Sequence, residues 1–115
     1  MPEQESIFTK IINRKADADI VYEDDEMIAI RDINPKAPVH ILLISKEPVA
    51  NLSAFTSEQE GLLGRMMLRV AEIAKEQGIA ESGYKVVTNN GPDGGQIVDH
   101  FHIHILGGEP VKTLV

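Results

Sequence analysis

Apolar positions recur with a period of two residues in several short segments of the chain, which is typical of β-strands. The alternation runs from Met27 to Ile33 and again from His100 to Leu106. Residues 39–44 form a continuous apolar run between prolines and polar residues, too short there for a helix. Strands are therefore expected at residues 20–22, 27–33, 39–44, 84–88 and 100–106. The acidic turn at 23–26 joins the first two as an antiparallel hairpin.

Helical spacing of apolar residues predicts two helices. A short one covers residues 6–12, with apolar positions 7, 8, 11 and 12. A long one is expected to begin at the capping box Ser57-x-x-Glu60 and to end at Gly78. Its apolar stripe is wide for a helix that covers one sheet, and Leu68 widens it further. Either a homodimer contact or deep packing in the core accounts for this width.

These elements predict one α+β domain spanning residues 1–115, a five-stranded antiparallel sheet with one long and one short helix. Hydrophobic residues make up 43% of the 115 residues, which is enough for one core. There is no repeat, linker or low-complexity segment that would divide the chain.

Charge and cysteine content narrow the possible functions. The net charge of −7 repels a phosphate backbone, so general DNA or RNA binding is disfavoured, although one small nucleotide is not. The absence of cysteine excludes disulfides, thiolate zinc sites and cysteine nucleophiles. The first thirty residues lack the pattern of a signal peptide, and no apolar run has the length of a membrane span. A cytoplasmic protein without a membrane partner is expected.

Histidines carry the main chemical signal. Of four in the chain, three are His100, His102 and His104, which project from one face of a strand. The alternating residues Phe101, Ile103 and Ile105 are expected to face the core. A plain solvent-exposed face would use threonine, lysine or glutamate there, so a row of imidazoles indicates a functional site.

Two chemical roles fit such a row. His100 and His104 are about 13 Å apart along a strand, so all three histidines cannot easily bind one ion. A metal site would therefore use two of them with outside ligands such as His40, Asp32 or Asp99. The favoured role is phosphate chemistry, in which a neutral imidazole attacks phosphorus. His102, with a neighbour on either side, is the best nucleophile. Gly94 and Gly95 would let backbone N–H groups approach an anion.

Residues 94–108, with the pattern His-φ-His-φ-His-φ, resemble the signature of the histidine-triad (HIT) family, where φ is a hydrophobic residue. Residues 93–96 and 106–108 resemble its branch of nucleotide-binding proteins, and 22–25 and 32–40 match the family's N-terminal half. The resemblance covers Ser6 to Gly108. It implies a homodimer with one continuous ten-stranded sheet. It also implies hydrolysis of purine nucleoside phosphoramidates, without metal or other cofactor, to the nucleoside 5′-monophosphate.

The resemblance also implies residue roles. His102 would attack the α-phosphorus to form a nucleotidyl-histidine, and His104 would contact the phosphate oxygens. His100 would orient the nucleophile, partly through its carbonyl, while His40 would support His100 and proton movement. The implied substrate-binding residues are apolar ones around the base, Asp32 at the ribose, and others near the phosphate: Ile7, Phe8, Ile11, Ile30, Asp32, Ile33, Asn89, Gly95, Gln96 and Ile97.

Two positions depart from the family pattern. Ile97 stands where a serine or acidic residue is common, and it cannot hydrogen-bond a leaving group. Asp99 stands where an apolar residue is common, and its charge would raise the pKa of the nearby histidines. These departures keep open a nucleotide-binding regulatory module with little turnover. Leu106-Gly107-Gly108 argues against dinucleoside polyphosphate hydrolysis, and the negative charge argues against processing of nucleic acid ends.

Overall fold

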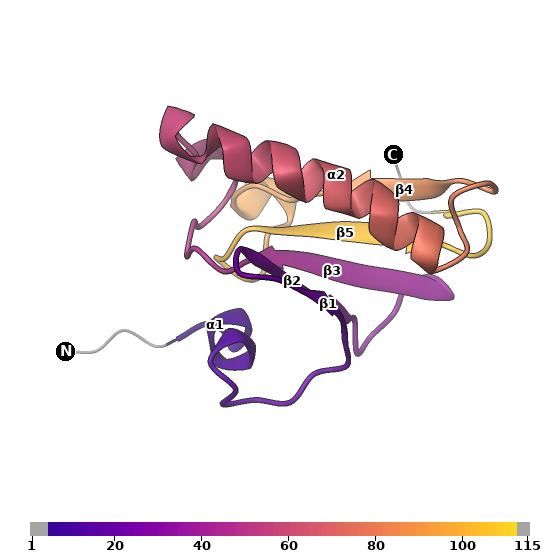
Figure 1. Ribbon diagram of the computed structural model, residues 1–115, viewed down its shortest axis with the longest axis horizontal. Coiled ribbons are helices and arrows are strands. Elements are labelled where there is room, and N and C mark those ends of the chain that lie inside the picture. The colour runs from indigo at the N-terminus through magenta and orange to yellow at the C-terminus, as the bar shows by residue number, and fades with distance from the viewer. Residues whose placement is uncertain (1–4, 113–115) are drawn as a thin grey trace.

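The computed structural model describes residues 5–112 and contains the predicted α+β fold (Figure 1). Five strands form one antiparallel sheet in the order β1-β2-β3-β5-β4. Two helices and three short 3-10 turns are the other elements of residues 5–112. In sequence order the elements are α1 (Ile7–Ile12), β1 (Ile20–Glu23), β2 (Met27–Arg31), β3 (Val39–Ser45), η1 (Leu52–Ala54), η2 (Ser57–Gln59), α2 (Glu60–Glu76), β4 (Tyr84–Val87), η3 (Pro92–Gly94) and β5 (His102–Gly107).

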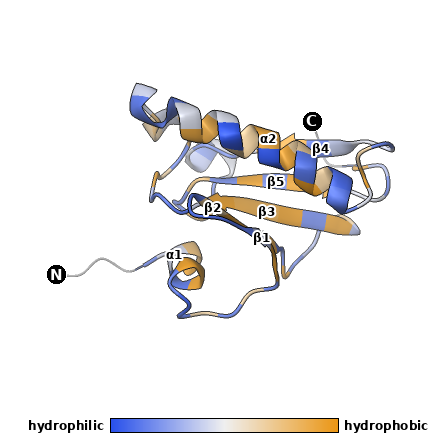
Figure 2. Cartoon of the chain, in the orientation of Figure 1, coloured by the Kyte–Doolittle hydropathy of each residue, from blue (hydrophilic) through white to orange (hydrophobic). Residues whose placement is uncertain are grey.

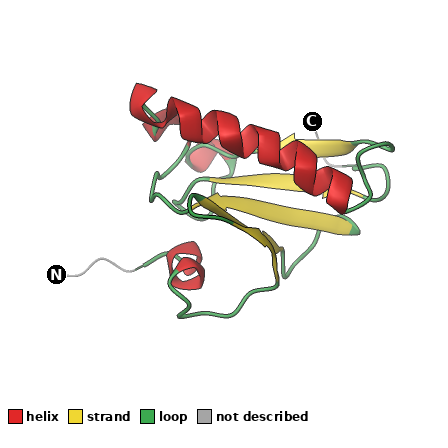
Figure 3. Ribbon diagram, in the orientation of Figure 1, coloured by secondary structure: helices red, strands yellow, loops and turns green. Residues whose placement is uncertain are grey.

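The sheet buries apolar side chains on both faces, and one helix lies against each (Figures 1 and 3). The predicted alternation in β2 is confirmed, since Met27 and Ala29 pack on the α2 side while Ile28 and Ile30 pack on the α1 side. β3, the most hydrophobic strand in Figure 2, is buried on both faces.

The alternation in β5 decides where the histidines point. Phe101, Ile103 and Ile105 belong to the cluster under α2, as predicted. Neighbouring side chains of a strand point to opposite faces, so His102 and His104 face the α1 side. The candidate site therefore lies under the short helix and leaves the packing against α2 undisturbed.

The start of the long helix differs from the prediction. The capping box is formed by Thr56 and Gln59, one position earlier than the expected pair, and it caps the 3-10 turn that leads into α2. The Gln59 side chain also donates to Glu47, 2.6 Å away, which is a tertiary contact that the local sequence does not reveal. The predicted stop is confirmed, because Gly78 has a φ of 77°.

α2 buries one stripe of apolar residues and leaves two large apolar side chains exposed. Leu62, Met66, Val70, Ile73 and Ala74 are buried against the sheet. Met67 and Leu68 have exposed fractions of 48% and 64%. Deep packing thus accounts for only part of the wide stripe, and the homodimer stays a prediction. No helix within residues 5–112 combines the length and the apolar character needed to cross a membrane.

Candidate active site

A cavity of about 450 Å³ opens on the α1 side of the sheet. Its walls come from α1, from β2 and the turn after it, from β3, and from the segment that precedes β5. His102 and His104 line it. β5 lies between β3 and β4 and is hydrogen-bonded to both, so the backbone that carries these two imidazoles is held on both sides.

His100 lies just before β5, which begins at His102 and not at His100 as predicted. The backbone bends there, where the N–H of His100 donates to the carbonyl of Val98 and the N–H of Phe101 donates to the carbonyl of Val49. The His100 ring is 3% exposed, and its Nε2 lies 2.6 Å from the carbonyl of Ser45, which places the proton on Nε2. Its Nδ1 lies 3.4 Å from the hydroxyls of both Ser6, the N-cap residue of α1, and Thr9 on α1.

His102 is oriented by the backbone of His100. Its Nδ1 lies 2.7 Å from that carbonyl, so the proton is on Nδ1 and the lone pair is on Nε2. Within residues 5–112, Nε2 of His102 has no hydrogen-bond partner. Burial is the main cause that lowers the pKa of His102, and this favours the neutral imidazole. A neutral ring with a free, cavity-facing Nε2 is the form that a nucleophile requires.

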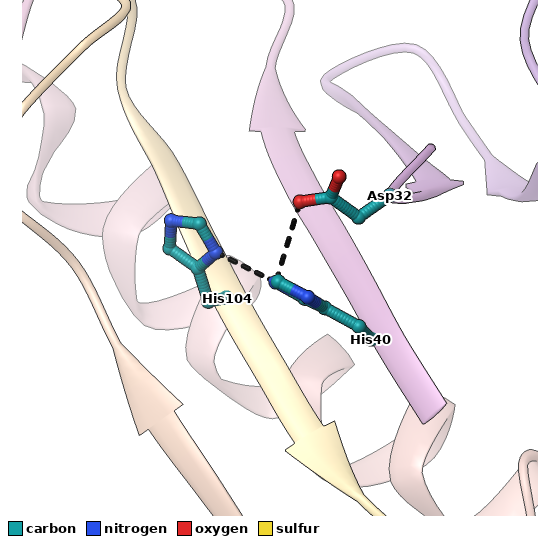
Figure 4. A group of neighbouring side chains, drawn as sticks. All are labelled: Asp32, His40 and His104. Atoms are coloured by element: carbon teal, nitrogen blue, oxygen red, sulfur yellow. Dashed lines mark hydrogen bonds and ion pairs between the residues drawn. The ribbon is translucent and has the colours of Figure 1, made fainter. Parts of the chain in front are cut away.

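His104, His40 and Asp32 form a second polar group beside the nucleophile (Figure 4). The Nε2 of His40 lies 2.9 Å from Nδ1 of His104 and 3.4 Å from Oδ2 of Asp32. The backbone N–H of Lys36 donates to Nδ1 of His40 over 3.0 Å. His40 therefore accepts at Nδ1 and, when neutral, carries its proton on Nε2.

Burial sets the protonation of these histidines. It is the main cause that lowers the pKa of His40, and with the neighbouring His102 and His40 it lowers the pKa of His104 to about 4. The expectation that Asp99 would raise the histidine pKa values is wrong for these groups. Asp99 is exposed and is not among the groups that act on their pKa values, while burial lowers the pKa of all three rings. All three rings are neutral at pH 7 in the unliganded protein.

The structure corrects the expected partner of His40. His40 contacts His104, and the two ring centroids are 5.2 Å apart. It does not support His100, because the antiparallel register pairs His40 with Leu106 and Ile44 with His102, which puts His40 and His100 at opposite ends of the β3–β5 ladder. The alcohol side chains of α1 and the Ser45 carbonyl hold His100 instead.

Asp32, His40 and His104 are also close enough together to form a cation-binding site, since one ligand atom from each lies within 4.8 Å of the others. A cation at Nε2 of His40 would displace the proton to Nδ1, where it would meet the N–H of Lys36. That donor therefore favours a protonated Nε2 over a metal-bound one. The group is arranged to hold protons.

Nine of the ten predicted substrate-binding residues line the cavity, together with six that the sequence did not single out. The nine are Ile7, Phe8, Ile11, Ile30, Asp32, Ile33, Asn89, Gly95 and Ile97, and the six are Asp17, Ala18, Arg31, Asn34, Leu42 and Val98. Leu42 could have been found from strand alternation, because it lies two residues from His40. The contacts of Ser6 and Thr9 with His100 had no signal in the sequence.

Gln96 is the exception. Its side chain accepts from the N–H of Gly91 and donates to the carbonyls of Ala50 and Val98, so it braces the loop and does not enter the cavity lining.

The glycine loop also differs from expectation. The N–H groups of Gly94 and Gly95 donate to carbonyls inside the loop, to Gly91 and Pro92 respectively, and are not free for an anion. The φ of 81° at Gly95 favours glycine, and the Asn89 side chain donates to the carbonyl of Gly94 over 2.7 Å. The loop therefore lines the cavity with Asn89, Gly95 and Ile97 and does not offer the N–H groups of Gly94 and Gly95 to an anion.

Comparisons of sequence and structure both find HIT proteins. A model of the HIT domain family matches residues 13–111. An uncharacterized HIT-like protein of Synechococcus elongatus is 55% identical over 105 residues, which cover 91% of each chain. A purine nucleoside phosphoramidase of Escherichia coli K12 is 47% identical over 112 residues, covering 97% of this chain and 94% of that one. A solved HIT family hydrolase from Clostridium thermocellum superposes with a TM-score of 0.93 at 40% identity, covering 99% of both chains.

Proposed function

Because this chain belongs to the HIT domain family, we propose that it is a metal-independent purine nucleoside phosphoramidase. It would cleave the P–N bond of a nucleoside 5′-phosphoramidate and release the nucleoside 5′-monophosphate. The relative from Escherichia coli with that name, 47% identical over nearly the whole chain, supports the substrate class. The observation that carries the proposal is the free Nε2 of His102, held toward the cavity by the bond from Nδ1 to the His100 carbonyl.

In the first step, Nε2 of His102 attacks the α-phosphorus and forms a P–N bond to the imidazole. The bond from phosphorus to the substrate nitrogen breaks, and its electron pair leaves with the amine. The ring becomes positively charged, and its Nδ1–H already donates to the His100 carbonyl, which stabilises that charge. A covalent nucleotidyl-histidine is the product of this step.

The leaving amine needs a proton, and His104 is the group placed to give it. The negative phosphate raises the proton affinity of a neighbouring imidazole, so substrate binding favours a protonated His104 that the empty cavity disfavours. His40, 2.9 Å away, connects that ring to the rest of the polar group. In the second step, water attacks phosphorus, His104 takes its proton, and Nε2 of His102 leaves.

The cavity walls suit a nucleotide. Apolar side chains of α1 and β2 would enclose the base, and the Asp32 carboxylate would accept hydrogen bonds from the ribose hydroxyls. Nothing in this wall separates adenine from guanine. A homodimer with one continuous ten-stranded sheet, and a cytoplasmic location, belong to the same proposal.

The test is release of AMP from adenosine 5′-phosphoramidate in the presence of a chelator, comparing the native protein with His102→Ala. We expect turnover by the native protein and a loss of roughly three orders of magnitude or more in the variant. AMP binding and circular dichroism of the variant show whether it still folds. If the His102→Ala protein does not fold, His102→Asn, which keeps a polar side chain, is used in its place.

A nucleotide-binding module with little turnover is the second candidate, and Ile97 is the observation that favours it. This side chain lines the cavity with an exposed fraction of 94% and offers no hydroxyl to a leaving group. The same assay separates the two functions. A native protein that binds AMP but leaves the phosphoramidate intact is a binding module, and the hydrolase proposal is then wrong.

A further inference from the structure

The ring of His100 is the imidazole that the proposed reaction does not use. It is buried, and the cavity is lined by His102 and His104 without it. Its Nε2 lies 2.6 Å from the carbonyl of Ser45 on β3, so the proton of the neutral ring is on Nε2. Nδ1 then carries the lone pair, and a buried lone pair requires a hydrogen-bond donor. That donor comes from α1.

Two hydroxyls at the start of α1 meet this nitrogen. The Oγ of Ser6 and the Oγ1 of Thr9 each lie 3.4 Å from Nδ1 of His100. As the N-cap of the helix, Ser6 accepts the N–H of Thr9 over 3.0 Å, and its hydroxyl donates to Oγ1 of Thr9 over 3.1 Å. The hydroxyl hydrogen of Ser6 is thereby used, and that of Thr9 is left for Nδ1. The capped first turn of α1 therefore presents a hydroxyl pair, Ser6 and Thr9, to His100.

The same turn of α1 also covers the ring of His102. The buried ring of Phe8 meets His102 edge to face, with centroids 4.9 Å apart and planes at 70°. It meets His100 in the same way, with centroids 6.1 Å apart and planes at 79°. α1 lies on the face of the sheet opposite α2 (Figure 1), and its Ile7, Phe8 and Ile11 line the cavity. One short helix therefore contacts the space for the ligand and the rings of both histidines.

His100 in turn fixes the orientation of His102. Its carbonyl lies 2.7 Å from Nδ1 of His102, which leaves Nε2 of that ring for the cavity. This carbonyl precedes β5, which begins at His102. The peptide that contains it is held through the N–H of Phe101, which donates to the carbonyl of Val49 over 2.7 Å, and through the side chain of His100. An anchored His100 ring thus keeps the acceptor for His102 in place.

We propose that Ser6 and Thr9 are positioning residues, which orient the nucleophile His102 through His100 when α1 lies against the sheet. The proposal rests on the proposed function in one respect, that His102 attacks phosphorus. The two hydroxyls do not line the cavity, and the His100 ring exchanges no proton in this role. A nucleotide base that packs against α1 stabilises the docked helix, and the same helix holds the nucleophile in its attacking orientation. Contacts remote from phosphorus then contribute to the chemical step as well as to binding.

The test removes the two hydroxyls and keeps the helix. Thr9→Val replaces the hydroxyl by a methyl group of similar size, and Ser6→Gly keeps an accepted N-cap residue. Because the Ser6 hydroxyl can turn to Nδ1 of His100 once Thr9 has lost its own, the double variant is the main one. Thr9→Ser retains the hydroxyl and is the conservative variant. Ile12→Ala is the matched control, since Ile12 packs against the apolar cluster under α1 but does not line the cavity and carries no hydroxyl.

The first readout is the single-turnover rate at saturating adenosine 5′-phosphoramidate, together with the affinity for AMP. The double variant should lose roughly tenfold to a hundredfold in rate, because a displaced nucleophile attacks more slowly. Its affinity for AMP should change by less than about threefold, since neither hydroxyl lines the cavity. Thr9→Ser should stay within about threefold of the native rate. Ile12→Ala should show the opposite pattern, with weaker binding of AMP and a native rate at saturation.

The second readout is ¹⁵N NMR of the histidine side chains at saturating AMP, which does not depend on turnover. The Nδ1 signal of His100 should shift in the double variant, because its lone pair loses the hydroxyl donor. The Nδ1–H proton of His102 should exchange with water roughly tenfold faster, since its acceptor is held less firmly. Thr9→Ser and Ile12→Ala should keep both signals close to those of the native protein.

A double variant with the native single-turnover rate would overturn the proposal and leave the hydrolase function intact. An equal loss of rate in Ile12→Ala would also overturn it, because the effect would then belong to the packing of α1 alone. If circular dichroism shows that the double variant does not fold, Thr9→Val and Thr9→Ser are compared, and equal rates in the two refute the role of the hydroxyl. If the native protein hydrolyses no phosphoramidate, the proposed function fails and the exchange of the His102 proton decides. Faster exchange in the double variant then supports the positioning role, and unchanged exchange overturns it.

Discussion

Protonation of His104 should make the fold acid-sensitive well above the pH at which carboxylates titrate. Its pKa is lowered from 6.5 in an unperturbed imidazole to about 4 in the folded protein, mainly by burial. Below pH 6.5 the unfolded chain therefore takes up a proton that the folded chain does not bind until about pH 4. A group of this kind supports folding fully above pH 6.5, and its contribution is lost as the pH falls toward 4.

The size of this effect follows from proton linkage. Between pH 7 and pH 5, the pKa values of 6.5 and about 4 correspond to a loss of about 2 kcal/mol in the free energy of unfolding. Part of the ring is reached by water, so about 1–2 kcal/mol is the expected range. Burial lowers the pKa of His40 and His102 as well, and both add to the loss in the same direction.

Urea unfolding of the native protein and of His104→Gln, at pH 7 and pH 5 and at one protein concentration, measures this contribution. The native protein should lose about 1–2 kcal/mol more than the variant over this interval. His104→Gln also loses the hydrogen bond to His40, which lowers the free energy of unfolding equally at both pH values. That loss cancels, because only the change in the free energy of unfolding between pH 7 and pH 5 is compared. An equal pH dependence in both proteins would refute the assignment of a low pKa to His104.

Two further substitutions test the packing around Gly108 and the cavity wall at Ile97. Gly108→Ala should lower the free energy of unfolding by about 1–3 kcal/mol, because Gly108 has a φ of 95° and a Cβ there would lie 2.9 Å from Cβ of Pro38. Gly94→Ala, where a Cβ meets nothing within 4 Å, is its control in urea unfolding and should change stability by less than about 0.5 kcal/mol. Ile97→Ser should leave stability within about 0.5 kcal/mol, because the side chain is 94% exposed, and should raise the rate of phosphoramidate hydrolysis by giving the leaving group a hydroxyl. Ile33→Ser, at 90% exposure in the same cavity, should weaken nucleotide binding without that gain, and equal rates in the native protein and Ile97→Ser would contradict the reasoning.

The features that the sequence predicted correctly depend on local periodicity. Alternation of His102 and His104 with Phe101, Ile103 and Ile105 was enough to put the imidazoles on the face opposite the core under α2. The same alternation assigned the two faces of β2. In each case, the neighbours within the strand determine which face of the sheet a side chain points to, and contacts elsewhere in the fold do not change it.

The features that the sequence could not predict depend on contacts between distant segments. His40 lies beside His104 because of the register between β3 and β5, which no local pattern specifies. The resemblance predicted Gln96 as a substrate-binding residue, yet its side-chain amide donates to the carbonyl of Ala50, which is far away in sequence. The observed capping box lies one residue before the predicted one. Thr56–Gln59 and Ser57–Glu60 both match the capping-box sequence pattern, and only the first places Gln59 against Glu47.

The placement of His102 and His104 on an interior strand has a consequence for local unfolding. β5 is hydrogen-bonded to β3 on one side and to β4 on the other, so its amide protons should exchange with solvent only when the whole sheet opens. α1 has six residues and is held mainly by Phe8 and Ile11, so it can detach at much lower cost. Large ligands can therefore enter and leave the cavity when α1 detaches from the sheet. His102 and His104 keep their positions on β5 until the whole protein unfolds.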